Sequence, residues 1–403
     1  MVKRDASDLA IRGGRPAFDR RLHVGEPNIG SEARFFERAR DLLRRRRLTN
    51  RGPFVREFES RIAGHVGVRH CIATCNATIA LEIAVRAAGL SGEVILPSWT
   101  FVATAHALQW QKMTPVFCDV DPGTYMIDPA RVEELITPRT TGILGVHLWG
   151  RSCDVEALTE IAGRRGVKLL FDAAHAFGCS RDGRMIGGFG EAEVFSFHAT
   201  KFINTFEGGA VVTDDDRIAD KVRLMQKFGF SGRDRVTCIG TNGKMSEIAA
   251  AMGLTSLEHI EEFLAANRAN WHAYREGLAG IDGLSLIEHD EREQSNCQYV
   301  AVEVDEQHAG IARDELLDVL HAENVVARRY FYPGVHRMEP YRSLQPQAGL
   351  QLPVTERIAS RSLLLPTGTA VSPDEVEGIC RIVRVAIAGA PLNPDVAAQP
   401  CAS

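Results

Sequence analysis

The chain has few lysines and no strong net charge. Lysine and arginine together number 47, only seven of them lysines, in a sequence of 403 residues. The formal net charge of −5 gives no global basic field that would favour nucleic acid. The run Arg44–Arg47 is a local exception, but no aromatic residues interleave with it. We therefore expect a solvated helix face or a contact with an anionic substrate there, and no nucleic-acid partner.

Disulfide, metal and membrane signals are also missing. The nine cysteines form no CxxC pair, and no metal-ligand spacing occurs among cysteines and histidines, so we expect no metal. Cys71, Cys118 and Cys179 lie in or beside apolar runs and are expected to be small buried residues. Charges at residues 3–5 replace the apolar stretch of a signal peptide, and no run of about 18 apolar residues is present. These patterns predict a soluble, cytoplasmic protein without membrane contact.

What the sequence does contain is an alternation of strand-like and amphipathic segments. A hydrophobic content of 45% can bury a large core, and the length suggests two or three domains. The alternation predicts an α/β fold with a mostly parallel sheet and helices on both faces. The predicted strands are Glu93–Pro97, Pro115–Val120, Thr141–His147, Lys168–Ala174, Glu191–Phe197 and Ala210–Thr213, and the predicted helices are Phe101–Gln111, Pro129–Ile136 and Val155–Arg164.

The pattern changes in the second half of the chain. We predict an N-terminal arm (1–25), a large domain (26–243), connecting helices (244–278) and a small C-terminal α+β domain (279–390). Residues 391–403, rich in proline and alanine, are expected to be a disordered tail. The small domain is predicted from strands at Tyr299–Val304 and Val325–Tyr330 and from helices at Arg313–Glu323 and Pro373–Ile387.

Lys201 is the most informative lysine. It ends the segment Ser196–Lys201, which follows the apolar run Glu193–Phe195. A primary amine can condense with an aldehyde and later be displaced by a substrate amine, which arginine cannot do. The pattern predicts an amine that holds a carbonyl cofactor as a Schiff base. For a lone lysine, a solvated residue at a strand end is the alternative.

A second element upstream supports the cofactor interpretation. Residues 168–176 form an apolar strand that ends in Asp172, followed by Ala173 and Ala174. A carboxylate at the carboxyl end of a buried strand faces the ligand crevice of an open α/β sheet, where a positive partner compensates its burial. Asp172 could instead cap a turn. Together with Lys201, it favours a pyridoxal phosphate site in which the carboxylate contacts the protonated ring nitrogen.

A third element predicts a seat for the phosphate. His70–Thr74 has the pattern of a short strand, and Ala77–Ala88 has the pattern of a helix. The start of such a helix offers free N–H groups and the positive end of a dipole, and the Thr78 hydroxyl can add a hydrogen bond. An N-cap at Asn76 without any ligand is the alternative.

In this order and with these spacings, the three elements resemble the fold-type I pyridoxal phosphate enzymes, specifically the DegT/DnrJ/EryC1/StrS family of sugar aminotransferases. Further similar segments are Asn50–Pro53, Pro97–Phe101, Gly240–Glu247 and Tyr330–Gly334, so the resemblance covers nearly the whole chain. It implies a large domain like that of aspartate aminotransferase and a smaller C-terminal α+β domain.

The resemblance also implies how the cofactor is bound. By position, Lys201 would form the internal aldimine and Asp172 would pair with the pyridine nitrogen. Phe101 would stack on one face of the ring, and His175 would lie near its phenolic oxygen.

The phosphate would be held by the Ala77 backbone, Thr78 and Ser196. In this family an asparagine from the neighbouring subunit also reaches the phosphate, and Asn242 occupies that motif, which implies a homodimer with shared active sites. Two departures are small: Ala77 stands where many relatives have glycine, and Trp149 stands where they often have tyrosine.

A nucleotide-sugar substrate would need arginine and aromatic contacts. Arg328, Tyr330, Tyr332 and His336 form a candidate cluster after a predicted strand, although an aromatic-rich surface loop is the alternative. Asn204, which follows Lys201, is a candidate for a hydrogen bond to a sugar hydroxyl.

Within the family, the segments Ser196–Gly209 and Gly240–Glu247 are most similar to enzymes that aminate C4 of a dTDP-4-keto-6-deoxyhexose. The resemblance implies transamination of dTDP-4-keto-6-deoxy-D-glucose for deoxyaminosugar and antibiotic biosynthesis, with glutamate as donor and pyridoxamine phosphate as the intermediate form of the cofactor. Amination at C3 is an alternative. A dehydratase branch carries histidine in place of the lysine, which Lys201 argues against. A non-catalytic regulator or scaffold is disfavoured by the intact set of Lys201, Asp172 and Thr78.

Overall fold

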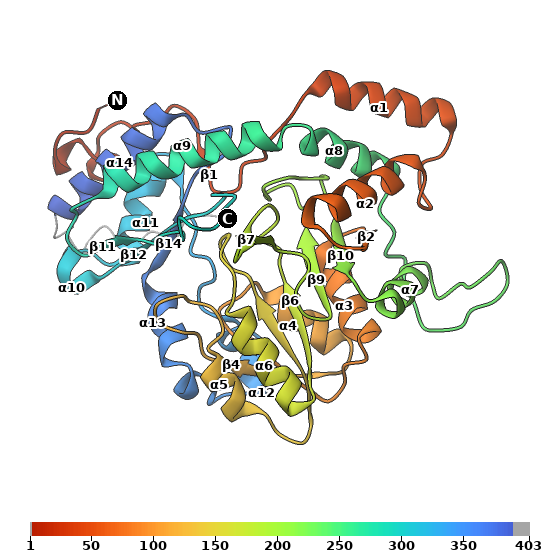
Figure 1. Ribbon diagram of the computed structural model, residues 1–403. Coiled ribbons are helices and arrows are strands. Elements are labelled where there is room, and N and C mark those ends of the chain that lie inside the picture. Colours follow the sequence, from red (N-terminus) through yellow and green to blue (C-terminus); the bar gives the residue numbers. More distant parts are fainter. Residues whose placement is uncertain (1, 390–403) are drawn as a thin grey trace.

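The computed structural model describes residues 2–389, and a seven-stranded sheet forms the centre of its large domain (Figure 1). The strand order is β2-β10-β9-β6-β5-β3-β4. Strand β10 is antiparallel to both of its neighbours, and all other pairs are parallel, which confirms the predicted mostly parallel sheet. The strands are β2 (His70–Thr74), β3 (Glu93–Pro97), β4 (Thr114–Cys118), β5 (Thr140–Val146), β6 (Lys168–Asp172), β9 (Ala192–Ser196) and β10 (Gly209–Thr213).

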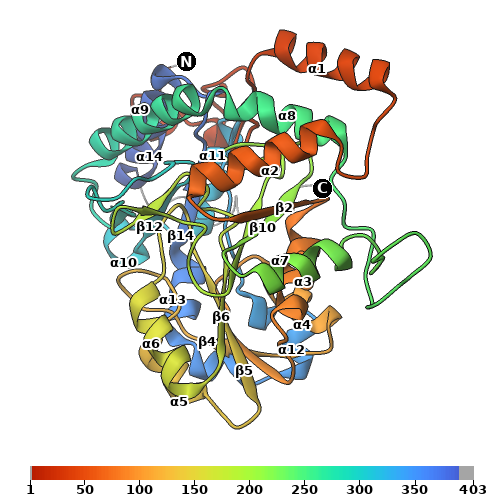
Figure 2. The same cartoon turned by 45° about the vertical axis from the view of Figure 1, so that its right-hand side comes forward.

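Helices cover both faces of this sheet, as predicted (Figures 1 and 2). Side chains alternate between the faces, so that Ile72 belongs to one core cluster and Cys71 and Ala73 belong to another. Burial on both faces explains why the strands are nearly continuous apolar runs. One face is covered by α3 (Ala77–Ala87), α4 (Val102–Trp110) and α7 (Asp216–Met225), and the other by α2 (Pro53–Val66), α5 (Pro129–Leu135), α6 (Val155–Arg165) and α8 (Glu247–Leu257).

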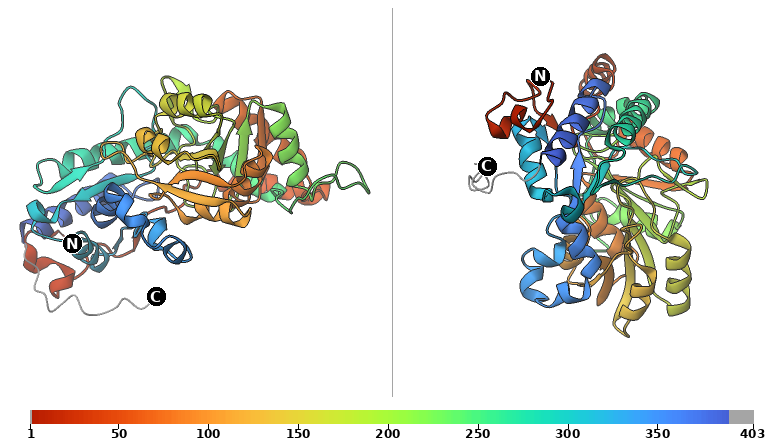
Figure 3. Two further views of the ribbon diagram at one scale, coloured as in Figure 1. Left: turned by 90° about the horizontal axis from the view of Figure 1, so that it is seen from below. Right: turned by 90° about the vertical axis from the view of Figure 1, so that its left-hand side faces the viewer.

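A smaller α+β unit packs beside the large domain (Figure 3). Its antiparallel sheet has the order β11-β12-β14, and the long helix α9 (Ile260–Leu278) packs against α14 (Pro373–Ala388). The N-terminal segment adds the short helices η1 (Ala6–Asp8) and η2 (Ala10–Arg12) and buries Leu9 and Leu22 in the same core. The other elements are α10 (Glu306–Ala309), α11 (Arg313–Ala322), β11 (Leu284–Leu286), β12 (Val300–Val304), β14 (Ser362–Leu365), and the parallel pair β1 (Leu22–His23) and β13 (Val325–Val326).

The connecting segment consists of two helices, α8 and α9, which are separated at residues 258–259. Two other details differ from the prediction. The strand predicted at Val325–Tyr330 ends at Val326, and beyond it only Arg328 pairs with a neighbour, Leu364. Residues 335–361, expected in the small domain, place Val335 and Tyr341 in a core of the large sheet. This segment contains η3 (Val335–Arg337), α12 (Tyr341–Leu344), η4 (Ala348–Gln351) and α13 (Pro353–Arg361).

Two smaller predictions concern the arginine run and the cysteines. Helix α1 (Glu32–Arg45) ends within the arginine run Arg44–Arg47, whose side chains are exposed as predicted. Cys71, Cys118 and Cys179 are buried and unpaired, also as predicted. Within residues 2–389, no helix has the length and apolar content needed to cross a membrane. The tail predicted at 391–403 lies outside the described residues. The remaining short strands are β7 (Ser180–Arg181) and β8 (Arg184–Met185).

Candidate active site

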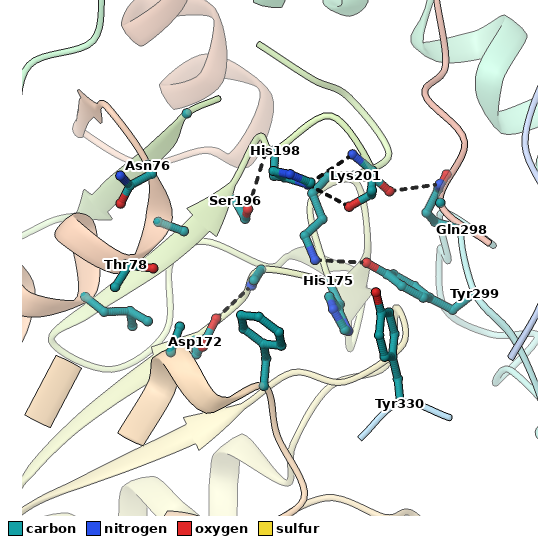
Figure 4. Close-up of a pocket in the computed structure, with 18 of the residues that line it drawn as sticks. Asn76, Thr78, Asp172, His175, Ser196, His198, Lys201, Gln298, Tyr299 and Tyr330 are labelled. Carbon is teal, nitrogen blue, oxygen red and sulfur yellow. Dashed lines mark hydrogen bonds between the residues drawn. The ribbon is translucent and has the colours of Figure 1, made fainter. Parts of the chain in front are cut away.

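A cavity of about 250 Å³ opens at the carboxyl edge of the large sheet (Figure 4). Strands β6 and β9 both end at this edge, and helix α3 begins there, as expected for a ligand crevice in an open α/β sheet. The small unit closes one side with Gln298 and Tyr299. The cavity brings together eight of the residues predicted from sequence: Ala77, Thr78, Phe101, Asp172, His175, Ser196, Lys201 and Tyr330.

Lys201 and Asp172 line the same cavity from neighbouring strand ends. Burial lowers the pKa of Lys201 to about 8, and the charge of Asp172 partly offsets that effect. An appreciable minority of the amine is therefore neutral near physiological pH. Burial also raises the pKa of Asp172, against the opposing effect of its hydrogen bonds. A buried carboxylate and an amine in this arrangement suit a reactive lysine rather than a solvated one.

The carboxylate of Asp172 is held in place although it is only 5% exposed. It accepts a hydrogen bond from the Thr104 hydroxyl at 2.8 Å and another from the Ala174 N–H at 3.1 Å. These bonds favour the charged form. The carboxylate also lines the cavity, where its remaining lone pairs could accept a hydrogen bond from a cationic group of a ligand.

The start of helix α3 forms an anion seat. Asn76 caps the helix by accepting the Ile79 N–H at 2.8 Å, so the predicted N-cap is present. Thr78 and Ser196 line the cavity beside this cap (Figure 4). A Cβ atom at Gly209 would lie 2.6 Å from the Ala77 nitrogen, so only glycine lets β10 approach the helix start this closely. First-turn N–H groups, two hydroxyls and the helix dipole together suit a phosphate.

Aromatic rings form the rest of the wall. Phe101 is 56% exposed and lies 6.3 Å from Phe331 between ring centroids. The ring of His175 lies 4.2 Å from that of Tyr299 and 5.7 Å from that of Phe331. Burial and the charge of Lys201 hold the pKa of His175 well below its usual range, so this imidazole is neutral. A flat ligand ring has stacking surfaces available on the cavity wall.

The structure contradicts two of the predicted sugar contacts. Asn204 is 1% exposed, and its amide donates to the Asn28 carbonyl at 2.9 Å and accepts the Phe206 N–H at 3.2 Å. His336 is 2% exposed, and its ring nitrogens contact Ser98 and Glu356. Both side chains are occupied inside the fold, so the prediction that they bind substrate is wrong for this structure.

The other three predicted substrate contacts differ in whether they line the cavity. Tyr330 lines the cavity, whereas Arg328 and Tyr332 do not. Arg328 is exposed and pairs through its main chain with Leu364. Tyr332 is 45% exposed and packs against the guanidinium groups of Arg313 and Arg329. A substrate role for Arg328 and Tyr332 stays a prediction.

Asn242 lies outside the cavity of its own chain. It is exposed and pairs with Lys227 at the base of the loop that follows α7, which projects from the body of the molecule (Figures 1 and 2). This loop exposes large apolar side chains, among them Phe228, Phe230, Val236 and Ile239. Its position is compatible with a contact to a second subunit, which stays a prediction.

Three residues that hydrogen-bond to Asp172 or to the lysine loop were not predicted. Thr104 bonds Asp172, Tyr299 accepts a hydrogen bond from the Lys201 amine at 3.2 Å, and Gln298 donates to the Thr200 carbonyl at 3.4 Å. For Thr104, the only local signal is its position four residues after Thr100, about one helical turn away, where the two hydroxyls hydrogen-bond. The other two come from the segment just before β12, nearly a hundred positions away, which no local pattern connects to the lysine. Among residues 2–389, no cluster of three or more histidine, cysteine or acidic side chains could hold a metal.

Comparison with known proteins agrees with this geometry. The profile of the DegT/DnrJ/EryC1/StrS aminotransferase family matches residues 30–384. The dTDP-4-amino-4,6-dideoxy-D-glucose transaminase of Shigella dysenteriae is 37% identical over 363 residues, which cover 90% of this chain and 98% of that protein. The dTDP-3-amino-3,4,6-trideoxy-alpha-D-glucose transaminase of Micromonospora megalomicea subsp. nigra is 35% identical over 347 residues, which cover 84% of this chain and 91% of that protein.

A solved structure is also similar over nearly the full length. DesI, crystallised in the presence of its TDP-sugar product, superposes with a TM-score of 0.91 at 53% sequence identity, covering 94% of this chain and 96% of DesI. The family match spans well over half of the sequence, and both curated relatives exceed 30% identity over most of it. The chain therefore belongs to the DegT/DnrJ/EryC1/StrS aminotransferase family, and it is an aminotransferase.

Proposed function

We propose that this enzyme uses pyridoxal 5′-phosphate to transfer an amino group from glutamate to C4 of dTDP-4-keto-6-deoxy-D-glucose. The observation that carries the proposal is the shared cavity in which the Lys201 amine, the Asp172 carboxylate and the helix α3 N-terminus converge. The similarity to a transaminase named for a 4-amino-4,6-dideoxy sugar, and to DesI with a TDP-sugar product, supports the choice of substrate.

The residues present fit the cofactor. Asp172 is a buried acid with protein donors on one side and a cavity on the other, which suits a protonated ring nitrogen. The close approach of Gly209 to Ala77 leaves a seat for the phosphate beside Thr78 and Ser196. When bound, the cofactor supplies an electron sink that makes the Cα proton of the donor acidic and carries the amino group to the second substrate.

Lys201 would serve first as the covalent anchor and then as the acid and base. Its pKa of about 8 leaves a neutral amine available to accept a proton near neutral pH. The ammonium formed in that step can return the proton, so one side chain serves both directions of each half-reaction. Phe101 would stack on one face of the cofactor ring, His175 would lie near its phenolic oxygen, and Asp172 would keep the ring cationic.

We further propose a homodimer in which Asn242 reaches the phosphate of the neighbouring active site. The projecting loop after α7 supports this, because it exposes Phe228, Val236 and Ile239 on a single-chain surface. Exposed apolar side chains that are grouped on one loop are typical of an interface between chains. Cross-complementation tests the idea, since a Lys201→Ala chain mixed with an Asn242→Ala chain would form one intact site per heterodimer.

The decisive experiment is a reaction of the purified enzyme with dTDP-4-keto-6-deoxyglucose and glutamate, with the product analysed by NMR. We expect a reducible absorbance band at the edge of the visible range and an amine at C4. Glutamine is the donor control, and Lys201→Ala is the protein control. An amine at C3 of a 3-keto substrate would support the alternative represented by the Micromonospora relative. A protein that lacks the band and turns over neither substrate would support a non-catalytic role.

A further inference from the structure

The amine of Lys201 contacts the small unit. Among residues 2–389, its one side-chain hydrogen-bond partner is the hydroxyl of Tyr299 at 3.2 Å (Figure 4). Lys201 lies in the loop after β9 of the large domain, whereas Tyr299 directly precedes β12 of the small sheet. The two units of the molecule therefore meet at the nitrogen that the proposed chemistry requires.

The ring of Tyr299 has little freedom to move. It is 7% exposed and lies against the ring of His175, with 4.2 Å between centroids. Its hydroxyl therefore points to a fixed place in the cavity. Burial holds the pKa of Tyr299 well above its usual range, so the phenol stays neutral beside the lysine.

The residue before Tyr299 fixes the main chain of the lysine loop. Gln298 donates to the Thr200 carbonyl at 3.4 Å and accepts the side-chain amide of Asn267 at 2.9 Å. Gln298 is 4% exposed, and Asn267 is fully buried. Two consecutive residues thus restrain the lysine loop, Gln298 through the Thr200 carbonyl and Tyr299 through the Lys201 amine.

Building on the proposed function, we propose that Tyr299 is a positioning residue that holds the amine of Lys201 while that amine transfers protons. Once released from the cofactor, a lysine side chain is a flexible four-carbon stem. If the phenol oxygen accepts one N–H, the stem is restrained and the nitrogen lone pair stays free to take the Cα proton. The resulting ammonium can still donate to the same oxygen, so the restraint persists through both protonation states.

The main test uses Tyr299→Phe, which keeps the ring against His175 and removes only the oxygen. The holoenzyme is mixed rapidly with glutamate, and the decay of the visible band is followed. We expect the decay to slow about ten- to hundredfold, which corresponds to loss of a hydrogen bond to a charged group. Substitution of the Cα hydrogen by deuterium should then slow the variant more than it slows the wild type, because proton transfer has become limiting.

The matched control is Tyr274→Phe. The Tyr274 hydroxyl is also buried in the small unit, where it donates to the Pro366 carbonyl at 2.8 Å, but it does not line the cavity. We expect this variant to keep the wild-type decay rate and isotope effect. A purely structural role for Tyr299 would instead slow both variants alike and leave the isotope effect unchanged, which would overturn the inference.

A second readout does not depend on turnover. The full-length enzyme freed of cofactor is mixed with pyridoxal phosphate, and the rate of band formation is measured against pH. The wild-type rate should rise with pH, and the midpoint of this rise should lie near pH 8, because the Lys201 amine becomes neutral there. In Tyr299→Phe the midpoint should move down by about one unit, because an acceptor that stabilised the ammonium has gone.

The two levels of the proposal fail in different ways. Equal decay rates, isotope effects and pH midpoints in Tyr299→Phe and wild type would overturn the positioning role and leave the proposed function standing. A wild-type enzyme that forms no reducible visible band with pyridoxal phosphate would overturn both.

Discussion

Removing the Thr104 hydroxyl tests how the buried acid of the site is kept ionised. In Thr104→Val, Asp172 loses a donor at 2.8 Å and keeps only the Ala174 N–H at 3.1 Å. A hydrogen bond to a charged group contributes about 1.5–3 kcal/mol. At about 1.4 kcal/mol for each pH unit, the pKa of Asp172 should rise by about one to two units.

The direction of the stability change follows from linkage. Burial already raises the pKa of Asp172, so ionising this acid costs stability as the pH rises through that value. The variant makes this cost larger. Chemical denaturation without cofactor should therefore show a loss of about 1.5–3 kcal/mol near neutral pH, because the full charged-group bond is lost there. The loss of stability should be smaller at pH values below the pKa of Asp172, because the Thr104 hydrogen bond stabilises the protonated acid less than the carboxylate.

The activity of the variant provides a second measurement. If an ionised Asp172 is required, the acid limb of the pH–rate profile should move to higher pH in Thr104→Val. Thr100→Val is the matched control, since the Thr100 hydroxyl bonds Thr104 at 2.9 Å and has no bond to Asp172. An unshifted acid limb, or a stability loss independent of pH and equal in both variants, would refute the argument.

Three further predictions concern the anchor, the acid and the phosphate seat. Lys201→Ala should purify without the borohydride-reducible band and should not turn over, and normal turnover would remove the lysine from the mechanism. Asp172→Asn keeps the shape and removes the charge, so its rate should fall at least about a hundredfold with little change in circular dichroism; undiminished activity would contradict the ring-nitrogen assignment. Gly209→Ala places a Cβ 2.6 Å from the Ala77 nitrogen, a backbone atom that cannot give way cheaply, so cofactor affinity should fall about tenfold or more. Gly64→Ala in α2 is its control, because nothing lies within 4 Å of that Cβ, and equal affinity in the two variants would count against the seat.

Much of the fold could be predicted because its strands are buried on both faces. Continuous apolar runs such as Glu93–Pro97 and His70–Thr74 match β3 and β2 residue for residue. Segments that owe their structure to tertiary contacts were harder to predict. Tyr341 packs on the edge of the large sheet through a ring contact with Phe117 and a hydrogen bond to His106, and neither partner is near it in sequence. The boundaries between domains stay a prediction for the same reason.

In the candidate site, too, some residues could be predicted from local sequence and others could not. Lys201, Asp172 and Thr78 were predictable because each stands at a strand end or a helix start, and parallel strands bring such ends to one edge of the sheet. Asn204 was assigned to the substrate because it follows the lysine. Proximity in sequence was misleading there, since the side chain points into the fold and bonds the Asn28 carbonyl.

That error reveals what holds the reactive loop in place. Asn28 is fully buried; its amide donates to the Phe202 carbonyl at 3.1 Å, and its own carbonyl accepts from Asn204. On the other side of the lysine, Gln298 donates to the Thr200 carbonyl. The main chain is thus bonded on both sides of Lys201 by amides from the N-terminal segment and the small unit. A buried amide without hydrogen-bond partners destabilises the folded state. These contacts therefore favour the one loop conformation in which the amides are hydrogen-bonded. The reactivity of Lys201 therefore depends on residues that local sequence patterns cannot connect to it.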